Sequence, residues 1–257
     1  MTKTEWFDRT NFFFILGHGR SGTRWLADLL DQAHRATVCH EPTRRDKGAY
    51  KEAFYNSEAA ELYIRDYRKN EIYERATSNE LICHGKNLRQ YSESHTIYGE
   101  VNSVLRRHCE ALQKEFPDAK FIHIVRDARN VVRSSVSRTA KCIRPPKDDP
   151  WIEYWEYRSI FEKFCWLWAK ENKYLRSNIE DQVKLELLVR DYDYFKERII
   201  DPLELQLSRL AWHAARKEVT GATERFKLPP WPEWDEKLMK QFLDICGREM
   251  TENGYGL

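Results

Sequence analysis

The stretch FFFILGHGRSGTRWLADLL, residues 12–30, decides the fold class, because an apolar run, a glycine-rich loop and an amphipathic segment follow one another in it directly. The apolar run predicts a buried strand, and the segment after the loop has the spacing of a helix. Gly17, Gly19 and Gly22 give the pattern G-x-G-x-x-G of dinucleotide-binding turns, while Gly17 and Gly22 alone give G-x-x-x-x-G, the frame of a P-loop. The sequence therefore predicts a strand–loop–helix unit that holds a phosphate group.

The polar residues among these glycines favour a binding loop over a merely tight turn. The N–H groups in the first turn of a helix lack partners within the helix, and together with the helix dipole they attract an anion. Arg20, Ser21 and Thr23 add a cation and two hydroxyl groups, which a structural turn does not need. The lysine of a P-loop NTPase is absent, since Thr23 and Arg24 follow the last glycine. A dinucleotide-binding enzyme stays open, because Glu41 lies 19 residues past that glycine, close to where an acidic residue would hold a ribose.

Length, charge and cysteine usage set limits on the class of protein. The chain of 257 residues is long enough for one large domain, which we expect to span 1–257, and its net charge of +2 calls for no nucleic-acid partner. The six cysteines form no C-x-x-C pair, as in the reduced thiols of a cytoplasmic protein. No stretch reaches the roughly 20 apolar residues of a membrane span, and no signal peptide is evident. We therefore expect a cytoplasmic protein without a membrane anchor.

Apolar runs alternate with helical segments along the chain. We expect strands at 12–16, 37–40, 81–83, 121–125 and 184–189, and helices at 22–32, 57–76, 103–116, 128–138, 151–177 and onward to the C-terminus. Strands that are apolar throughout indicate a parallel sheet with both faces covered. The sequence therefore predicts an α/β fold with a central parallel sheet flanked by helices.

A second stretch, FPDAKFIHIVRDARNVVRSSVSR at 116–138, adds a candidate anion clamp. Arg126 ends an apolar strand, and Ser134 follows eight positions later within the next helix. Ligands bind at the carboxyl ends of parallel strands, where a guanidinium can hold a phosphate through two hydrogen bonds. A nucleotide with phosphates at two separate positions would use both this clamp and the glycine loop. A dinucleotide dehydrogenase has no evident use for the clamp.

Together the two stretches resemble the PAPS-dependent sulfotransferases, whose donor is 3′-phosphoadenosine 5′-phosphosulfate (PAPS). GHGRSGTRW (17–25) is similar to the family's 5′-phosphosulfate loop, and IVRDARNVVRS (124–134) is similar to its 3′-phosphate motif. The resemblance continues through LLVRDYDYF (187–195) and ENGYG (252–256), and so covers nearly the whole chain. It implies a P-loop-kinase-like sulfotransferase fold and no metal. The implied reaction moves a sulfuryl group from PAPS to a hydroxyl of a small soluble acceptor, such as a sugar or polar secondary metabolite, and leaves PAP.

The resemblance assigns donor-binding roles to residues that match these motifs. Arg20 stands where the family has a lysine or arginine on the 5′-phosphosulfate, and Trp25 stands where a tryptophan packs on adenine. Arg126 and Ser134 would hold the 3′-phosphate, and Tyr192 is matched to a tyrosine near adenine. The other donor-binding residues implied by the match are Gly19, Ser21, Gly22, Thr23 and Arg24.

Two adjacent residues are candidates for the base that removes the acceptor's proton. TVCHEPTRR (37–45) places His40 and Glu41 at the end of the second expected strand, beside the glycine loop. A carboxylate and an imidazole are both able to take the proton as the acceptor oxygen attacks sulfur. Glu41 followed by Pro42 resembles the carbohydrate and protein-tyrosine sulfotransferases, which have a glutamate after the second strand. This resemblance implies that Glu41 is the base, with His40 as the alternative.

One position departs from the family pattern. Val101, in the segment GEVNS, stands where many relatives have a lysine that contacts the sulfuryl group. We expect Arg20, Arg24 or Asn102 to supply that contact. Two other classes of protein stay open: an NAD(P)-dependent oxidoreductase that uses the three loop glycines and Glu41, and a nucleotide-binding protein without catalysis.

Overall fold

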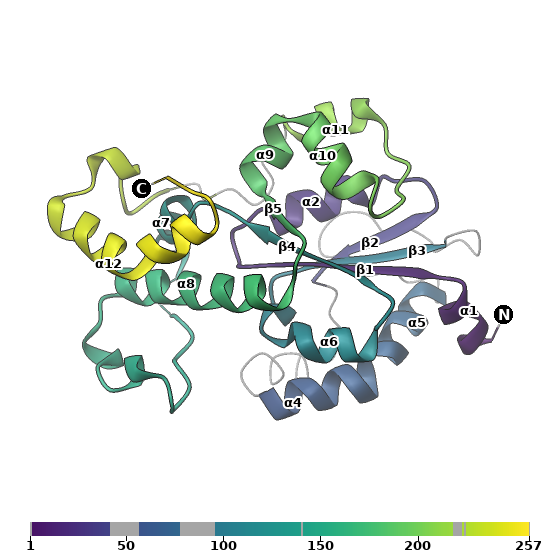
Figure 1. Cartoon of the computed structure of the whole chain (residues 1–257), viewed down its shortest axis with the longest axis horizontal. Coiled ribbons are helices and arrows are strands. Elements are labelled where there is room, and N and C mark those ends of the chain that lie inside the picture. Colours follow the sequence, from purple (N-terminus) through teal and green to yellow (C-terminus); the bar gives the residue numbers. More distant parts are fainter. Residues whose placement is uncertain are drawn as a thin grey trace.

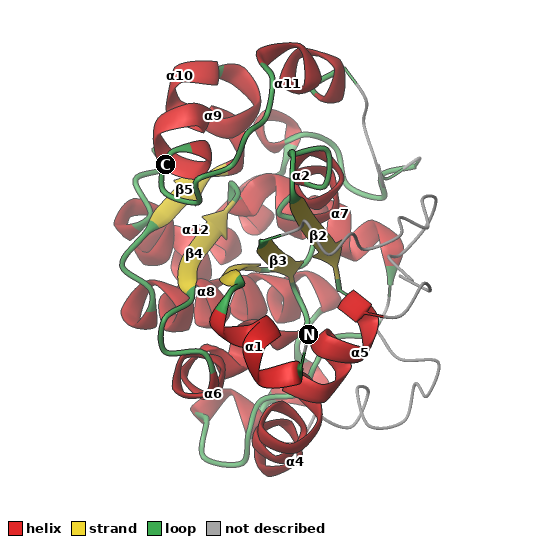
Figure 2. Ribbon diagram, turned by 90° about the vertical axis from the view of Figure 1, so that its right-hand side faces the viewer, coloured by secondary structure: helices red, strands yellow, loops and turns green. Residues whose placement is uncertain are grey.

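The computed structural model describes residues 2–41, 57–77, 96–139, 141–217, 223 and 225–256. Within these residues a five-stranded sheet runs through the centre of the molecule in the order β2-β3-β1-β4-β5 (Figures 1 and 2). The strands are β1 (Asn11–Gly17), β2 (Ala36–His40), β3 (Ile97–Asn102), β4 (Lys120–Val125) and β5 (Gln182–Lys184). All four pairings between neighbours are parallel. The predicted α/β fold with a central parallel sheet is therefore confirmed.

Helices cover both faces of the sheet (Figure 1). One face packs against α2 (Thr23–Leu30), α9 (Leu185–Arg190), α10 (Tyr192–Phe195), η5 (Lys196–Ile200) and α11 (Arg209–Ala215). The other packs against α1 (Lys3–Asp8), α4 (Ser57–Leu62), η1 (Tyr63–Arg68), α5 (Lys69–Thr77), η2 (Leu105–His108), α6 (Cys109–Glu115) and the end of α8 (Ile160–Asn178). A third apolar cluster joins α8 to α7 (Ala128–Arg138), η3 (Pro150–Ile152), η4 (Trp155–Tyr157), η6 (Trp231–Glu233) and α12 (Glu236–Glu252).

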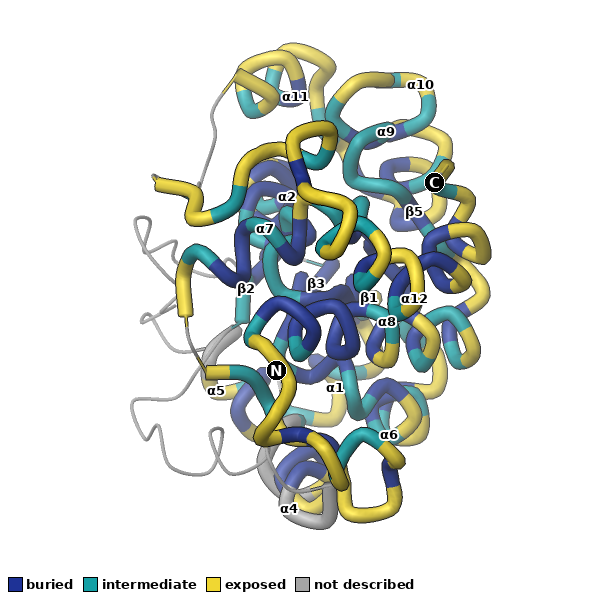
Figure 3. The backbone as a smooth tube through the Cα atoms, turned by 90° about the vertical axis from the view of Figure 1, so that its left-hand side faces the viewer, coloured by how far each residue is buried: buried dark blue, intermediate teal, exposed yellow. Residues whose placement is uncertain are grey.

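The central strand β1 explains why its sequence is apolar without a break. Phe13 and Ile15 lie in the cluster on one face, whereas Phe14 and Leu16 lie on the opposite face with α1 and α6. Side chains alternate between the faces of a strand, so a strand covered on both sides needs an apolar residue at every position. Figure 3 shows the resulting buried centre along β1 and β3.

Most predicted elements are confirmed, and the helix predicted at 128–138 is α7 with the same bounds. The strands predicted at 12–16, 37–40 and 121–125 are β1, β2 and β4, and the helices predicted at 22–32, 57–76 and 103–116 are α2, α4 to α5, and η2 with α6. The strand predicted at 81–83 lies outside the described residues.

Two predicted elements are wrong. The strand predicted at 184–189 ends at Lys184, where β5 gives way to α9, because Leu185, Leu188 and Val189 have helical spacing and cover the sheet from one side. The helix predicted at 151–177 begins only at Ile160, after two short 3₁₀ turns. Its start is fixed by a capping box, in which Ser159 and Glu162 each bond the other's backbone N–H.

Candidate active site

A cavity of about 500 Å³ opens where the loop after β1 meets the carboxyl ends of β2 and β4. The chain leaves β1 toward β2 and β3 on one side, and β4 and β5 complete the sheet on the other. Such a switch point is where open α/β sheets bind ligands. The cavity is lined by Gly19, Arg20, Gly22, Thr23, Arg24, Trp25, His40, Glu41, Ser103, Arg126, Asn130, Arg133, Ser134, Arg138, Thr223 and Phe226. The structure therefore brings together most of the residues singled out from the sequence.

The glycine loop turns sharply so that the N-terminus of α2 faces this cavity. Gly22 is the N-cap of α2, with φ at 79°, and a Cβ at this position would lie 2.5 Å from the side chain of Leu185. Glycine is therefore required both for its conformation and for its close packing. Arg20 also has a positive φ, of 75°, which is costly for a residue with a side chain and is typical of ligand-binding loops. Ser21 is fully buried, and its Oγ has no hydrogen-bond partner among the described residues.

The two sequence motifs meet directly in this cavity. The Nε of Arg20 donates to the Oγ of Ser134 at 2.9 Å, and an Nη of Arg126 donates to the carbonyl of Arg20 at 2.8 Å, although Arg126 lies 106 residues away along the chain. The Oγ of Ser134 also lies 2.7 Å from the Oγ1 of Thr223. Burial, then the charges of Arg138 and Arg126, lower the pKa of Arg20. The cavity thus gathers cations that raise one another's energy and that a bound anion would neutralise.

One side of α7 adds cations that the sequence analysis did not single out. Asn130, Arg133 and Arg138 line the cavity together with Ser134. The guanidinium of Arg133 lies 3.8 Å from the ring centroid of Phe226, and its Nε donates to the carbonyl of Leu228 at 2.9 Å. Asn130, Arg133, Ser134 and Arg138 recur about once in each turn of α7 and therefore share one face of the helix. This spacing is the signal by which the sequence would have revealed them.

Both candidate bases reach the cavity. The strand β2 ends at His40, and Glu41 has a φ of 45°, so the chain turns and the alternation of a strand no longer separates the two side chains. The carboxylate of Glu41 accepts hydrogen bonds from the N–H of Ser103, at 3.2 Å, and from its Oγ. The Nε2 of His40 lies 3.1 Å from the Oγ1 of Thr23 and 3.8 Å from the Glu41 carboxylate.

Some expected contacts are not formed. Tyr192 does not line the cavity; its ring packs edge-on against Trp212, with centroids 5.5 Å apart. Asn102 is fully buried, and its Oδ1 accepts from backbone N–H groups at the start of η2, so it does not reach the cavity. Val101 is equally buried in the core. Trp25 does line the cavity, held by a 3.0 Å hydrogen bond from its indole N–H to the carbonyl of Ala215.

Comparison with known proteins agrees with this arrangement. Residues 13–209 match the sulfotransferase family. The chain belongs to the sulfotransferase family. Comparison with curated proteins gave no match.

Solved structures of other sulfotransferases resemble this one. The sulfotransferase domain of the Synechococcus PCC 7002 olefin synthase aligns with a TM-score of 0.52 at 15% identity, covering 97% of this chain and 96% of that one. The sulfotransferase domain from the curacin biosynthetic pathway aligns with a TM-score of 0.50 at 13% identity, covering 96% of this chain and 99% of that one. A mouse sulfotransferase complexed with PAP aligns at 0.47 and 14% identity, covering 96% of this chain and 87% of that one. The first two likenesses show that this sulfotransferase has the fold of its family.

In the described part of the chain, none of the helices combines the length and the apolar character that crossing a bilayer requires.

Proposed function

We propose that this sulfotransferase moves a sulfuryl group from PAPS to a hydroxyl of a small-molecule acceptor and releases PAP. The observation that carries the proposal is the junction of two anion-binding motifs in one cavity. Among the described residues, five arginines and one carboxylate line this cavity. PAPS has anionic groups at two separate positions, so cations from both motifs suit it. A dinucleotide oxidoreductase would leave Arg126 and Ser134 without a role. The cavity volume of about 500 Å³ lies within the range of small-molecule sites.

In this proposal each part of the cavity binds one part of the donor. The N-terminus of α2 and Thr23, which line the cavity, would hold the 5′-phosphosulfate. Ser21 would contribute from the buried side of the loop, where its Oγ has no hydrogen-bond partner among the described residues. Arg126 and Ser134 would hold the 3′-phosphate, and the indole of Trp25 would pack on adenine.

The proposed reaction is an in-line displacement at sulfur. The acceptor oxygen attacks sulfur, the bond from sulfur to the phosphate oxygen breaks, and PAP leaves with the bonding electrons. Glu41 takes the acceptor's proton, as in the glutamate-base branch of the family. Arg20 would stabilise the charge that grows on the leaving phosphate oxygen. Cations already gathered in the cavity would thus serve both donor binding and catalysis.

We place this activity in the cytoplasm. In the described part of the chain, Cys109, Cys142, Cys165 and Cys246 are free thiols. Free thiols of this kind are typical of proteins in reducing compartments, which supports that location.

Titration calorimetry with PAP, NADH and ATP tests the donor class. We expect PAP to bind much more tightly than the other two, and tight binding of NADH without PAP would overturn the proposal. Labelled PAPS incubated with a panel of hydroxyl compounds then identifies the acceptor by transfer of the label.

The base is tested by Glu41→Gln, which keeps the shape of the side chain and removes its basicity. We expect turnover of labelled PAPS to fall by about 10²–10⁴ while PAP affinity stays nearly unchanged. His40→Asn is the matched comparison and should cost far less. If His40→Asn abolishes turnover and Glu41→Gln does not, the base is His40.

A further inference from the structure

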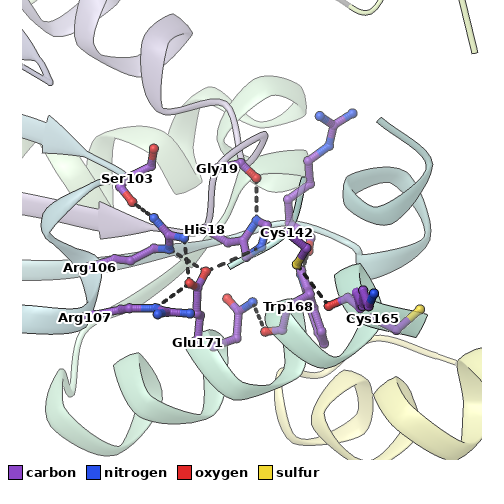
Figure 4. A network of polar contacts seen from close by, with 12 residues as sticks. His18, Gly19, Ser103, Arg106, Arg107, Cys142, Cys165, Trp168 and Glu171 are labelled. Carbon is purple, nitrogen blue, oxygen red and sulfur yellow. Dashed lines mark hydrogen bonds and ion pairs between the residues drawn. The ribbon is translucent and has the colours of Figure 1, made fainter. Parts of the chain in front are cut away.

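A buried ion-pair cluster lies directly beneath the candidate active site, and the reaction proposed above does not use it (Figure 4). Glu171, on α8, has a side chain only 2% exposed. Arg106 donates to both of its oxygens, with Nη2 to Oε1 at 2.6 Å, and Arg107 donates to Oε1 at 2.8 Å. Burial alone would raise the pKa of Glu171, but neighbouring cations, Arg106 foremost, outweigh it and hold the pKa at about 2. The carboxylate is therefore ionised.

The cluster connects to the proposed base through two hydrogen-bonded steps. The Nη1 of Arg106 donates to the backbone carbonyl of Ser103. The N–H and the Oγ of the same Ser103 donate to Oε1 of Glu41. Glu171 thus reaches Glu41 through one guanidinium and one serine, although α8 contributes no residue to the lining of the cavity.

The geometry of the guanidinium makes this connection directional. Arg106 has a planar fork, and Glu171 occupies two of its nitrogens, so the third is fixed toward Ser103. Pinning the Ser103 carbonyl fixes the adjacent peptide, and both Ser103 donors then meet one oxygen of Glu41. Within the described residues, the hydrogen bonds and the ion-pair contact of Glu41 all fall on Oε1, which leaves Oε2 to receive a proton. A buried ion pair is seldom more stable than apolar packing, so stability alone does not account for this cluster.

We infer that Arg106, oriented by Glu171, is a positioning residue that sets the direction of the Glu41 carboxylate through Ser103; the inference rests on the proposed function. Arg106 touches neither donor nor acceptor, so its loss should act on turnover and leave donor affinity in place.

Arg106→Lys tests the inference, because lysine keeps the charge but cannot bond Glu171 and Ser103 together in the same plane. The reaction measured is the hydrolysis of labelled PAPS, in which water takes the place of the acceptor and sulfate and PAP are released. We expect its turnover to fall by about 10- to 100-fold, as misplaced catalytic groups typically cause. The PAP dissociation constant from titration calorimetry should change by less than about threefold, within the scatter of a substitution outside the site.

Arg107→Lys is the matched control, since Arg107 donates to the same carboxylate but, among the described residues, makes no hydrogen bond to Ser103. Its turnover should stay within about threefold of the wild type. Should Arg106→Lys not fold, Glu171→Asp takes its place, because it keeps the charge and shifts Arg106 by one methylene. Ser103→Ala should lose turnover in the same way, and Ser103→Thr should restore it by returning the hydroxyl.

The outcomes separate this inference from the proposed function. Equal losses in Arg106→Lys and Arg107→Lys, or a loss of PAP affinity that parallels the loss of turnover, would make the cluster a structural support only. A wild-type protein that binds no PAP would instead overturn the proposed function, and the inference with it.

Discussion

Two groups of arginines lie next to each other in this sulfotransferase, and their surroundings differ. In the buried cluster, Arg106 and Arg107 share the carboxylate of Glu171, so each has an acidic partner within the protein. In the cavity, burial is the main cause that lowers the pKa of Arg20, and the charges of its neighbours Arg138 and Arg126 lower it further. The arginines of the buried cluster thus meet a carboxylate of the protein itself, whereas Arg20 in the cavity faces like charges, as suits a site for an anion.

The buried cluster of Arg106, Arg107 and Glu171 should therefore lose the most stability when its carboxylate is removed. Glu171→Gln takes the carboxylate away from the buried Arg106 and from the partly exposed Arg107, which costs about 3–5 kcal/mol in the free energy of unfolding. Urea unfolding of the variant and the wild type measures the difference. A loss below about 1 kcal/mol, as at an ordinary surface site, would remove the distinction between the two groups.

The cavity should respond instead in ligand affinity. Arg126→Ala should weaken PAP binding from several-fold up to a thousandfold, since a hydrogen bond to a charged group contributes roughly 1.5–3 kcal/mol and the Coulomb attraction adds to it. Adenosine 5′-phosphosulfate lacks the 3′-phosphate and serves as the control ligand, whose weaker affinity should scarcely change. Calorimetry that shows equal losses for both ligands would contradict the assignment of Arg126.

Two buried histidines make the stability of the protein depend on pH. Burial, before any other cause, lowers the pKa of His18 and of His123 to about 4. The unfolded chain takes up protons near pH 6.5 and the folded chain does not, so the free energy of unfolding is fully present above pH 6.5 and falls as the pH drops toward 4. At pH 5 the loss should be roughly 2 kcal/mol per histidine.

His123→Leu isolates one of these two histidines, because His123 does not line the cavity and, within the described residues, its ring hydrogen-bonds Asn172 alone, at 3.0 Å. The variant should take up one proton fewer on unfolding between pH 6.5 and 4. Unfolding curves at several pH values measure this slope, and an unchanged slope would show that His123 is not the group that titrates.

The sequence predicted what is encoded locally. The apolar strands at 12–16 and 121–125 and both phosphate motifs are continuous in sequence, and the structure confirms the strands and brings the motifs together. The strand β3 was missed because Glu100 interrupts it with a charged residue. That side chain is buried and accepts a 3.0 Å hydrogen bond from the hydroxyl of Tyr98, two residues earlier on the same strand.

The remaining errors have other physical causes. An apolar run such as LELLV at 185–189 suits a buried strand and a helix equally. Periodicity alone therefore does not distinguish the predicted strand from the helix α9 that is observed. The sequence does contain a signal for the start of α8, because Ser159 and Glu162 have the spacing of a capping box. The cluster around Glu171 could not be predicted from the sequence, since it joins residues 65 positions apart. Only the packing of α8 beneath the sheet brings them into contact.

The central place of β1 has a consequence for the synthesis of the chain. Residues 11–17 pair with 97–102 on one side and with 120–125 on the other, so this apolar strand emerges from the ribosome long before either partner. At roughly 5–20 residues per second, translation takes about 5–20 s to reach β4. During that interval FFFIL is exposed with both edges unpaired, as in aggregation-prone segments. The nascent chain therefore presents an apolar stretch of the kind that chaperones bind, and Phe13, Phe14, Ile15 and Leu16 within it are buried once folding is complete.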